Sequence, residues 1–250
     1  MKMKLEPRAV RVLIFDLDDT LYTSDAKMLD VARRLLKETG LQEYSKLSDD
    51  RLRKAFSQGP DRWLNEYMLE NDVDQHWRPS HDMWVEYGRR LLSSLGIKGK
   101  ASNLGADMIS KWESYGVDMR SRLPGEAKSV LKELNSRDYR LGLVTNRWGD
   151  PAPLLDRDSI LDLFQAIEYS RVPGYMKPSP FMLIQAATRL GINPCRCACI
   201  GDFVIIDVEA ARRAGMTPIL LTSYNPKESE QAPPDVTIVG NIRDLLEIFL

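Results

Sequence analysis

The spacing of apolar residues divides the chain into segments of two kinds. Short, mainly apolar runs that are typical of buried parallel strands lie at 12–15, 140–145, 166–169, 197–200, 217–221 and 236–239. From residue 123 onward these runs alternate with stretches of helical periodicity at 125–136, 154–164, 180–190 and 207–214, and a last helix is expected from 242. This alternation predicts an α/β fold, with a Rossmann-like parallel sheet that carries helices on both faces.

The first apolar run is separated from the others by a long segment of purely helical character. The predicted helices of this segment lie at 25–38, 49–57, 61–69, 80–95 and 102–114, and no strand is evident among them. A lone strand at 12–15 could bury neither of its faces, so it belongs with the later sheet. We therefore expect an α/β core of residues 1–22 and 117–250, and an all-helical cap domain of residues 23–116 inserted after the first strand.

The first strand ends in an acidic stretch, Asp16-Leu-Asp18-Asp19-Thr20. In open α/β sheets, ligands bind outside the carboxyl ends of the strands. Residues two apart on an extended backbone point the same way, so Asp16 and Asp18 could face one pocket, where their repulsion would raise at least one pKa or recruit a cation. The same residues also suit a simpler structure, an Asx-rich turn that caps the next segment.

Three later segments place polar side chains at a strand end or ahead of a helix. Thr145 and Asn146 close one strand, where a hydroxyl and backbone N–H groups could hold phosphate oxygens. Lys177 lies just before a predicted helix, and Asp202 and Asp207 follow another buried strand. Each segment alone suits a turn, a solvated charge or a helix cap. Together they supply what a phosphate-handling site at the first strand end would need.

The order and spacing of these segments resemble the four motifs of the haloacid dehalogenase superfamily. The matching segments are Asp16-Leu-Asp-Asp-Thr20, Val144-Thr145-Asn146, Lys177-Pro178, and Gly201-Asp202 followed by Asp207. This resemblance implies magnesium-dependent phosphoryl transfer in two steps. Asp16 would attack phosphorus and form an aspartyl-phosphate, while Asp18 would protonate the leaving oxygen and then activate water.

The resemblance also implies a Mg2+ site. Its ligands would be the Asp16 carboxylate, the Asp18 backbone carbonyl and Asp202, with Asp207 in support. The other motif residues would hold the transferring phosphoryl group, namely Thr145, the backbone of Asn146, and Lys177.

Two positions depart from the pattern of the superfamily. The residue after Asp202 is often small and polar, and the residue before Asp207 is often Asn, but this chain has Phe203 and Ile206 there. Each loses a possible hydrogen bond beside the metal, which would weaken metal binding without removing a ligand.

Because it has an aspartate two residues after the nucleophile, the chain is similar to the phosphatases and phosphomutases of this superfamily. We expect a phosphomonoester hydrolase that acts on a small phosphorylated metabolite. The alternatives are a phosphomutase of the same superfamily and a catalytically idle relative that binds a ligand or partner. Substrate choice would lie in the helical cap.

Composition and charge limit the classes of partner that we expect the chain to bind. The chain is 43% hydrophobic and 28% charged, and its 35 basic and 36 acidic residues give a net charge of -1, so nothing favours nucleic acid as a partner. No apolar run approaches the roughly 18 residues of a membrane span, and the start lacks the apolar core of a secretory signal. We expect no membrane partner and a cytoplasmic location, and both a monomer and a homodimer fit the sequence.

Overall fold

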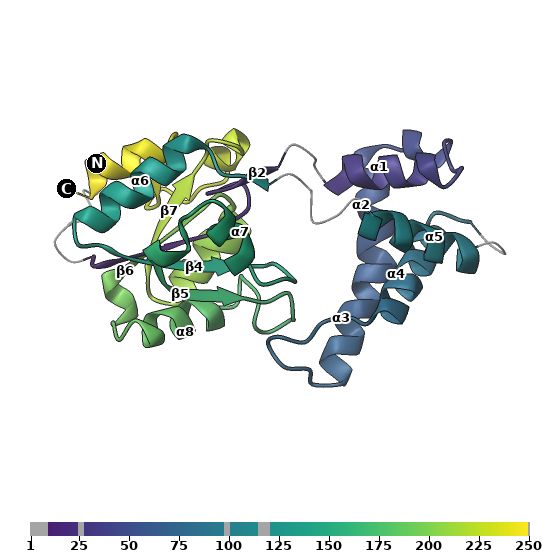
Figure 1. Ribbon diagram of the computed structural model, residues 1–250, viewed down its shortest axis with the longest axis horizontal. Helices are drawn as coiled ribbons and strands as arrows, with labels where there is room; N and C mark the ends of the chain where they lie inside the picture. Colours follow the sequence, from purple (N-terminus) through teal and green to yellow (C-terminus); the bar gives the residue numbers. More distant parts are fainter. Residues whose placement is uncertain (1–9, 25–27, 98–100, 115–120, 250) are drawn as a thin grey trace. The chain divides into compact units, whose positions relative to one another are not determined.

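The computed structural model describes residues 10–24, 28–97, 101–114 and 121–249, which form two compact units (Figure 1). One unit comprises Met1–Thr23 and Arg122–Leu250, and the other comprises Ser24–Ser121. That each folds as an independent domain, with limits at residues 22 and 117, stays a prediction.

The first unit is built on a parallel sheet with the strand order β5-β4-β1-β6-β7-β8. Its strands are β1 (Val12–Phe15), β4 (Arg140–Thr145), β5 (Phe164–Tyr169), β6 (Cys197–Gly201), β7 (Thr217–Leu221) and β8 (Thr237–Val239). Within the sheet Ile14 lies opposite Gly142 of β4 and Cys199 of β6. The first strand of the chain is therefore interior to the sheet, which explains why all four of its residues are apolar and buried.

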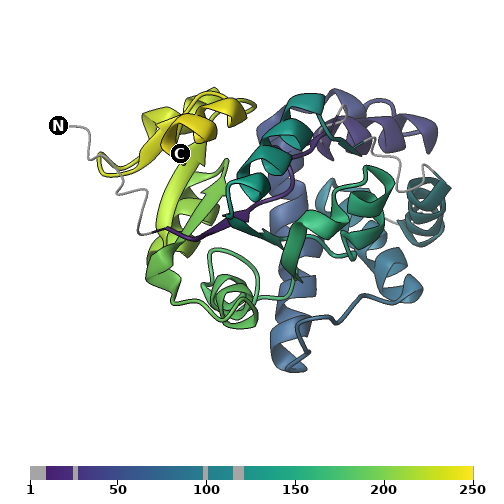
Figure 2. The same ribbon diagram turned by 60° about the vertical axis from the view of Figure 1, so that its left-hand side comes forward.

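Helices cover both faces of this sheet, and β1 contributes alternate residues to each side. Leu13 and Phe15 pack with α6 (Gly125–Ser136), α7 (Ala152–Arg157) and α10 (Leu245–Ile248). Val12 and Ile14 pack with α8 (Phe181–Arg189) and α9 (Glu209–Arg213) on the opposite side. Figure 1 and Figure 2 show the sheet between these layers. The prediction of an α/β fold with a Rossmann-like parallel sheet is confirmed.

Three of the predicted helices differ in detail. The helix expected at 154–164 breaks after α7, because Ser159 adopts a positive φ of 55°, and a 3-10 turn at Leu161–Leu163 leads into β5. The helix expected from 207 begins earlier, with a π-helical turn at Val204–Val208 that continues into α9. The last helix starts as a 3-10 turn, Ile242–Asp244.

The second unit is helical, as predicted for the insert. It contains α1 (Met28–Glu38), a 3-10 turn at Tyr44–Lys46, α2 (Asp49–Gln58), α3 (Pro60–Glu70), α4 (His81–Ser94) and α5 (Ala101–Ser114). The side chains of Ser48 and Ser80 cap α2 and α4 by accepting backbone N–H groups. Helices α4 and α5 pack closely, since a Cβ on Gly88 of α4 would lie 2.9 Å from the carbonyl oxygen of Gly105 of α5.

Some features of this unit were not predicted. Two-residue strands, β2 (Thr23–Ser24) and β3 (Ser121–Arg122), pair with each other where the chain leaves and re-enters the α/β unit. The first three residues of the helix predicted at 25–38 lie outside the described residues. Among the described residues, no helix is both long and apolar enough to cross a membrane.

Candidate active site

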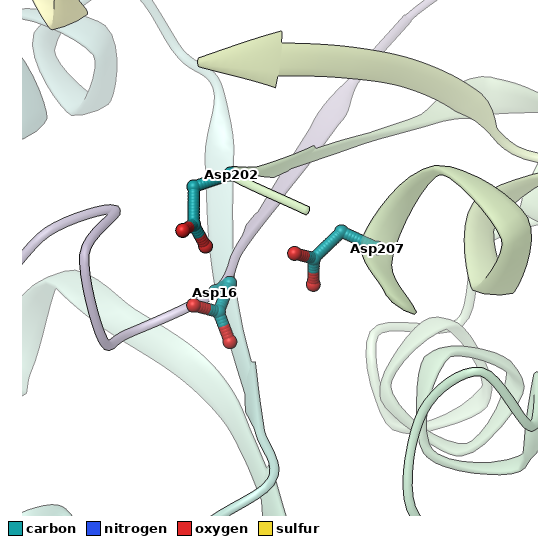
Figure 3. Close-up of side chains that lie close together, drawn as sticks. All are labelled: Asp16, Asp202 and Asp207. Carbon is teal, nitrogen blue, oxygen red and sulfur yellow. The ribbon is translucent and has the colours of Figure 1, made fainter. Parts of the chain in front are cut away.

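Three aspartates converge at the carboxyl edge of the sheet. Asp16 directly follows β1, Asp202 follows β6, and Asp207 lies in the π-helical turn after β6. Figure 3 shows their carboxylates pointing toward one another, and one oxygen from each lies within 4.8 Å of the others. All three residues are buried. The structure thus brings together three of the aspartates that the sequence had placed at strand ends.

The local backbone makes room for this cluster. The N–H of Asp16 donates to the carbonyl of Ile200 at 2.8 Å, which continues the ladder between β1 and β6 to the strand ends. A Cβ on Gly201 would lie 2.3 Å from Cγ of Asp207, so only glycine leaves space for the Asp207 carboxylate there.

Lys177 is the cation of the cluster. Its Nζ donates to Oδ1 of Asp16 and to Oδ1 of Asp207, both at 2.6 Å, and the residue is only 2% exposed. Burial by itself lowers the pKa of the ammonium, but the carboxylates of Asp16 and Asp207 outweigh burial and raise this pKa above its ordinary value. Lys177 is therefore a fixed positive charge at the end of β1.

Burial has the opposite effect on two of the carboxylates. It raises the pKa of Asp16 to about 7, with Lys177 opposing the rise and Asp207 adding to it. Burial, followed by the charges of Asp16 and Asp207, raises the pKa of Asp202 to about 8. Crowded, buried carboxylates of this kind suit a hard divalent cation, whose charge replaces the protons. The cluster of Asp16, Asp202 and Asp207 therefore fits a divalent metal.

Asp202 is held by two donors from distant parts of the chain. The hydroxyl of Thr20 donates to its Oδ1 at 3.3 Å, and the amide of Asn225 donates to its Oδ2. The backbone N–H of Phe203 donates to Oδ2 of Asp207 at 3.0 Å. The expected effect of Phe203 and Ile206 on metal binding stays a prediction. Sequence reasoning missed Asn225, which lies in a polar loop with no motif around it.

Thr145 and Asn146 lie where predicted, at the end of β4. Thr145 is buried at the end of β4, the strand next to β1. In this pair of strands Phe15 of β1 lies opposite Leu143 of β4. The side chain of Asn146 makes two hydrogen bonds to the backbone of Lys177, donating from Nδ2 to the carbonyl and accepting at Oδ1 from the N–H, both at 2.8 Å. The peptide bond between Lys177 and Pro178 is cis. From the sequence, the backbone of Asn146 was expected to hold phosphate. The two hydrogen bonds that its side chain makes to the backbone of Lys177 were not predicted.

Asp18 is placed differently from the buried aspartates. Its side chain is 51% exposed and accepts hydrogen bonds from Nε and Nη2 of Arg147, the first at 2.8 Å. Sequence reasoning missed Arg147, because an arginine in the loop after β4 has the appearance of a solvated charge.

Known proteins resemble the chain over most of its length. A glyceraldehyde 3-phosphate phosphatase of Methanopyrus kandleri is 25% identical over 257 residues, covering 96% of this chain and 97% of that protein. A phosphoglycolate phosphatase of Nitrosococcus oceani is 27% identical over 216 residues, covering 86% of this chain and 85% of that protein.

Solved structures share the fold. A predicted phosphoglycolate phosphatase from Haemophilus somnus superimposes with a TM-score of 0.66 at 19% identity, covering 97% of this chain and 99% of that one. The HAD hydrolase YfnB from Bacillus subtilis, solved bound to magnesium, gives a TM-score of 0.59 at 18% identity, with 96% and 98% covered.

The family comparison agrees with the motifs and the fold. Residues 10–215 match the model of the haloacid dehalogenase-like hydrolases, a stretch that runs from β1 past Asp207. The resemblance drawn from the sequence is thereby confirmed. The chain belongs to the haloacid dehalogenase-like hydrolase family.

Proposed function

We propose that this chain is a Mg2+-dependent phosphomonoester hydrolase that acts on a small phosphorylated metabolite through an aspartyl-phosphate. The observation that carries the proposal is the setting of Asp16. Its carboxylate accepts a hydrogen bond from the ammonium of Lys177 and clusters with the carboxylates of Asp202 and Asp207 at the carboxyl edge of the sheet. The relatives named above support the substrate class, because they are phosphatases of phosphoglycolate and of glyceraldehyde 3-phosphate.

The residues divide the chemistry among them. Oδ1 of Asp16 accepts from Lys177, so Oδ2 is the candidate nucleophile. As the bond from Asp16 to phosphorus forms, the bond from phosphorus to the ester oxygen breaks, and Asp18 gives that oxygen a proton. Asp18 then takes a proton from water, which attacks phosphorus and releases Asp16 and inorganic phosphate.

The charges around Asp16 serve the transfer itself. Lys177 is already fixed at 2.6 Å from Oδ1 of Asp16, beside the attacking oxygen, so it can stabilise the oxygens of the transferring phosphoryl group without reorganising. Thr145 and the backbone N–H groups of the loop after β4 hold the same group. Mg2+ bound by Asp16, the Asp18 carbonyl and Asp202, with Asp207 in support, would neutralise the charge shared by carboxylates and phosphate.

Hydrolysis of p-nitrophenyl phosphate, phosphoglycolate and glyceraldehyde 3-phosphate tests the proposal, measured with Mg2+ and with EDTA. We expect release of inorganic phosphate only with Mg2+, and a loss of more than about 1,000-fold in Asp16→Asn. Asp162→Asn, at an exposed aspartate of the same unit, is the control that keeps its activity. Phosphate release by Asp16→Asn would contradict the aspartyl-phosphate, movement of phosphate within one sugar without release would favour a mutase, and no turnover would favour an idle relative.

A further inference from the structure

A surface cavity of the helical unit, here called the α2–α4 cavity, lies between α2 and the end of α4. It has a volume of about 380 Å³, and all of its lining residues belong to the same compact unit. The lining residues are Arg51, Lys54, Ala55, Gln58, Ser94 and Leu95. Ligand pockets of proteins usually measure about 300–1,000 Å³, so a small metabolite fits this cavity.

The cavity combines an apolar floor with a polar rim. Arg51, Lys54 and Gln58 are three or four residues apart on α2, so they follow one another along one side of the helix, and all three are exposed. Ala55 and Leu95 are buried and belong to the apolar core of this unit. A ligand in the cavity would therefore meet two positive charges at the rim and two apolar side chains below them.

The two cations of the rim have no carboxylate partner. Among the residues that the structure describes, no carboxylate oxygen lies within 4.0 Å of the guanidinium of Arg51 or the ammonium of Lys54. Asp50 precedes Lys54 by four residues, a spacing that suits an ion pair on a helix, yet the two do not pair. By contrast, Arg33 pairs with Asp49 of the same helix at 2.8 Å. Arg51 and Lys54 thus keep two neighbouring positive charges open toward the cavity.

The other polar groups of the cavity also suit a ligand. The hydroxyl of Ser94 donates to the carbonyl of Arg90 at 2.9 Å, so its oxygen still has room to accept a hydrogen bond. The side-chain amide of Gln58 has no partner among the described residues and offers both a donor and an acceptor. The partial negative charge at the end of α4 gives Arg51 and Lys54 a rival role, the stabilisation of that helix end. The ligand role and the rival role differ in what they predict for binding.

We propose that the α2–α4 cavity binds a small organic molecule that carries a doubly charged phosphate or phosphonate group. Arg51 and Lys54 bind the charged group, which balances their two charges, and Ala55 and Leu95 contact an apolar part of the same molecule. The site needs neither the metal nor the nucleophile of the other unit. The inference therefore goes beyond the proposed function and does not depend on it.

Phenylphosphonate is the probe that tests this inference, because it joins a dianion to an apolar ring and contains no ester to hydrolyse. Its binding to the full chain is followed in EDTA by the NMR signals of the Gln58 side-chain amide and the Leu95 methyl groups. We expect both sets of signals to shift and to saturate with one dissociation constant. Benzyl alcohol has the ring without the charge, so it should bind at least about tenfold more weakly.

Variants of α2 assign the binding to the two cations. The double variant Arg51→Gln/Lys54→Gln should raise the dissociation constant for phenylphosphonate at least about tenfold, because it loses the charge-assisted hydrogen bonds. Both residues are exposed, and thermal melting checks that the variant folds. Arg53→Gln is the matched control, since Arg53 is an exposed arginine of α2 outside the cavity, and its dissociation constant should be unchanged.

Several results would overturn the inference. They are the absence of shifts at Gln58 and Leu95, equal affinity for benzyl alcohol, and equal weakening in Arg53→Gln, which would indicate unspecific attraction to a basic helix. A double variant with a lower Tm and an unchanged dissociation constant would give Arg51 and Lys54 the rival role at the end of α4. Shifts confined to the side-chain amides of Asn146 and Asn225 would place the probe at the candidate active site alone, which overturns this inference and leaves the proposed hydrolase untouched.

Discussion

Asn146 and Lys177 exchange two hydrogen bonds of 2.8 Å, although they belong to different loops of the sheet edge. The amide of Asn146 thereby fixes the backbone from which the Lys177 side chain reaches Oδ1 of Asp16 at 2.6 Å. Asn146 therefore acts on the nucleophile indirectly, by positioning the cation beside it.

Replacing Asn146 should damage both stability and catalysis. Asn146→Ala leaves the N–H and carbonyl of Lys177 without these partners, at a cost of about 1–3 kcal/mol in the free energy of unfolding. We expect kcat to fall about tenfold or more, because Lys177 loses its fixed position. Urea unfolding and steady-state kinetics measure the two effects. Asn193→Ala, which removes a side chain that caps the turn at Pro194–Arg196, should cost stability without lowering kcat. An unaltered kcat in Asn146→Ala would show that Lys177 needs no such support.

Gly201 should tolerate no side chain. Gly201→Ala would place a Cβ 2.3 Å from Cγ of Asp207, so the carboxylate must move away from Lys177 and the other aspartates. We expect a loss of Mg2+ binding by calorimetry together with a loss of phosphatase activity. Gly125→Ala is the matched control, because a Cβ there meets nothing within 4 Å. Full Mg2+ affinity in Gly201→Ala would contradict the assigned place of Asp207.

Asn225 should matter for the metal more than for the fold. Its amide donates to Oδ2 of Asp202, so Asn225→Ala removes a group that orients a ligand. Such changes typically weaken metal affinity about 10–100-fold, and we expect the dissociation constant for Mg2+ to rise within that range. Ser229→Ala, in the same loop, loses only a hydrogen bond to the Pro226 carbonyl and serves as the control. Equal Mg2+ affinities for both variants would count against this assignment.

The effect of Mg2+ on stability should grow with pH. In the metal-free protein, burial raises the pKa of Asp202 from 3.8 to about 8, so the folded state holds a proton that the unfolded state has released. The stability from this proton is complete below about pH 4 and is lost as the pH rises through about 8. Mg2+ binds the deprotonated carboxylates, so its affinity increases over the same range.

Thermal unfolding with excess Mg2+ and with EDTA, between pH 6 and pH 9, checks this expectation. The rise in Tm caused by Mg2+ should be larger at the upper end of this range, and Asp202→Asn should reduce the pH dependence to the part that comes from Asp16. A rise in Tm that is the same at both ends would contradict the link between the protons and the metal.

The sequence predicted those parts of the site that follow recognisable strands. Asp16 and Asp202 each come directly after a buried apolar run, and parallel strands bring their carboxyl ends to one edge of the sheet. The helical insert was also recognisable, because helical periodicity repeats within a short stretch of chain. Both inferences depend only on neighbours in the sequence.

Other features depend on contacts that no local pattern records. Asn225 meets Asp202 only because β7 lies beside β6, and the bridge from Asn146 to Lys177 joins two loops. Arg147 gains its partner through the pairing of β4 with β1. The break after α7 rests on the backbone angle of Ser159, a residue type with no strong preference for positive φ.

The interior position of β1 determines when the proposed activity can appear during synthesis. The strand that leads into Asp16 is synthesised before β4 and β6, yet it pairs with both, and β6 comprises Cys197–Gly201. A nascent or cleaved chain that stops before β6 exposes one edge of β1 and lacks Asp202 and Asp207, so Asp16 has no metal partners. The proposed activity would thus appear only after Asp207 has been synthesised, so turnover reports that β1 has paired with β6.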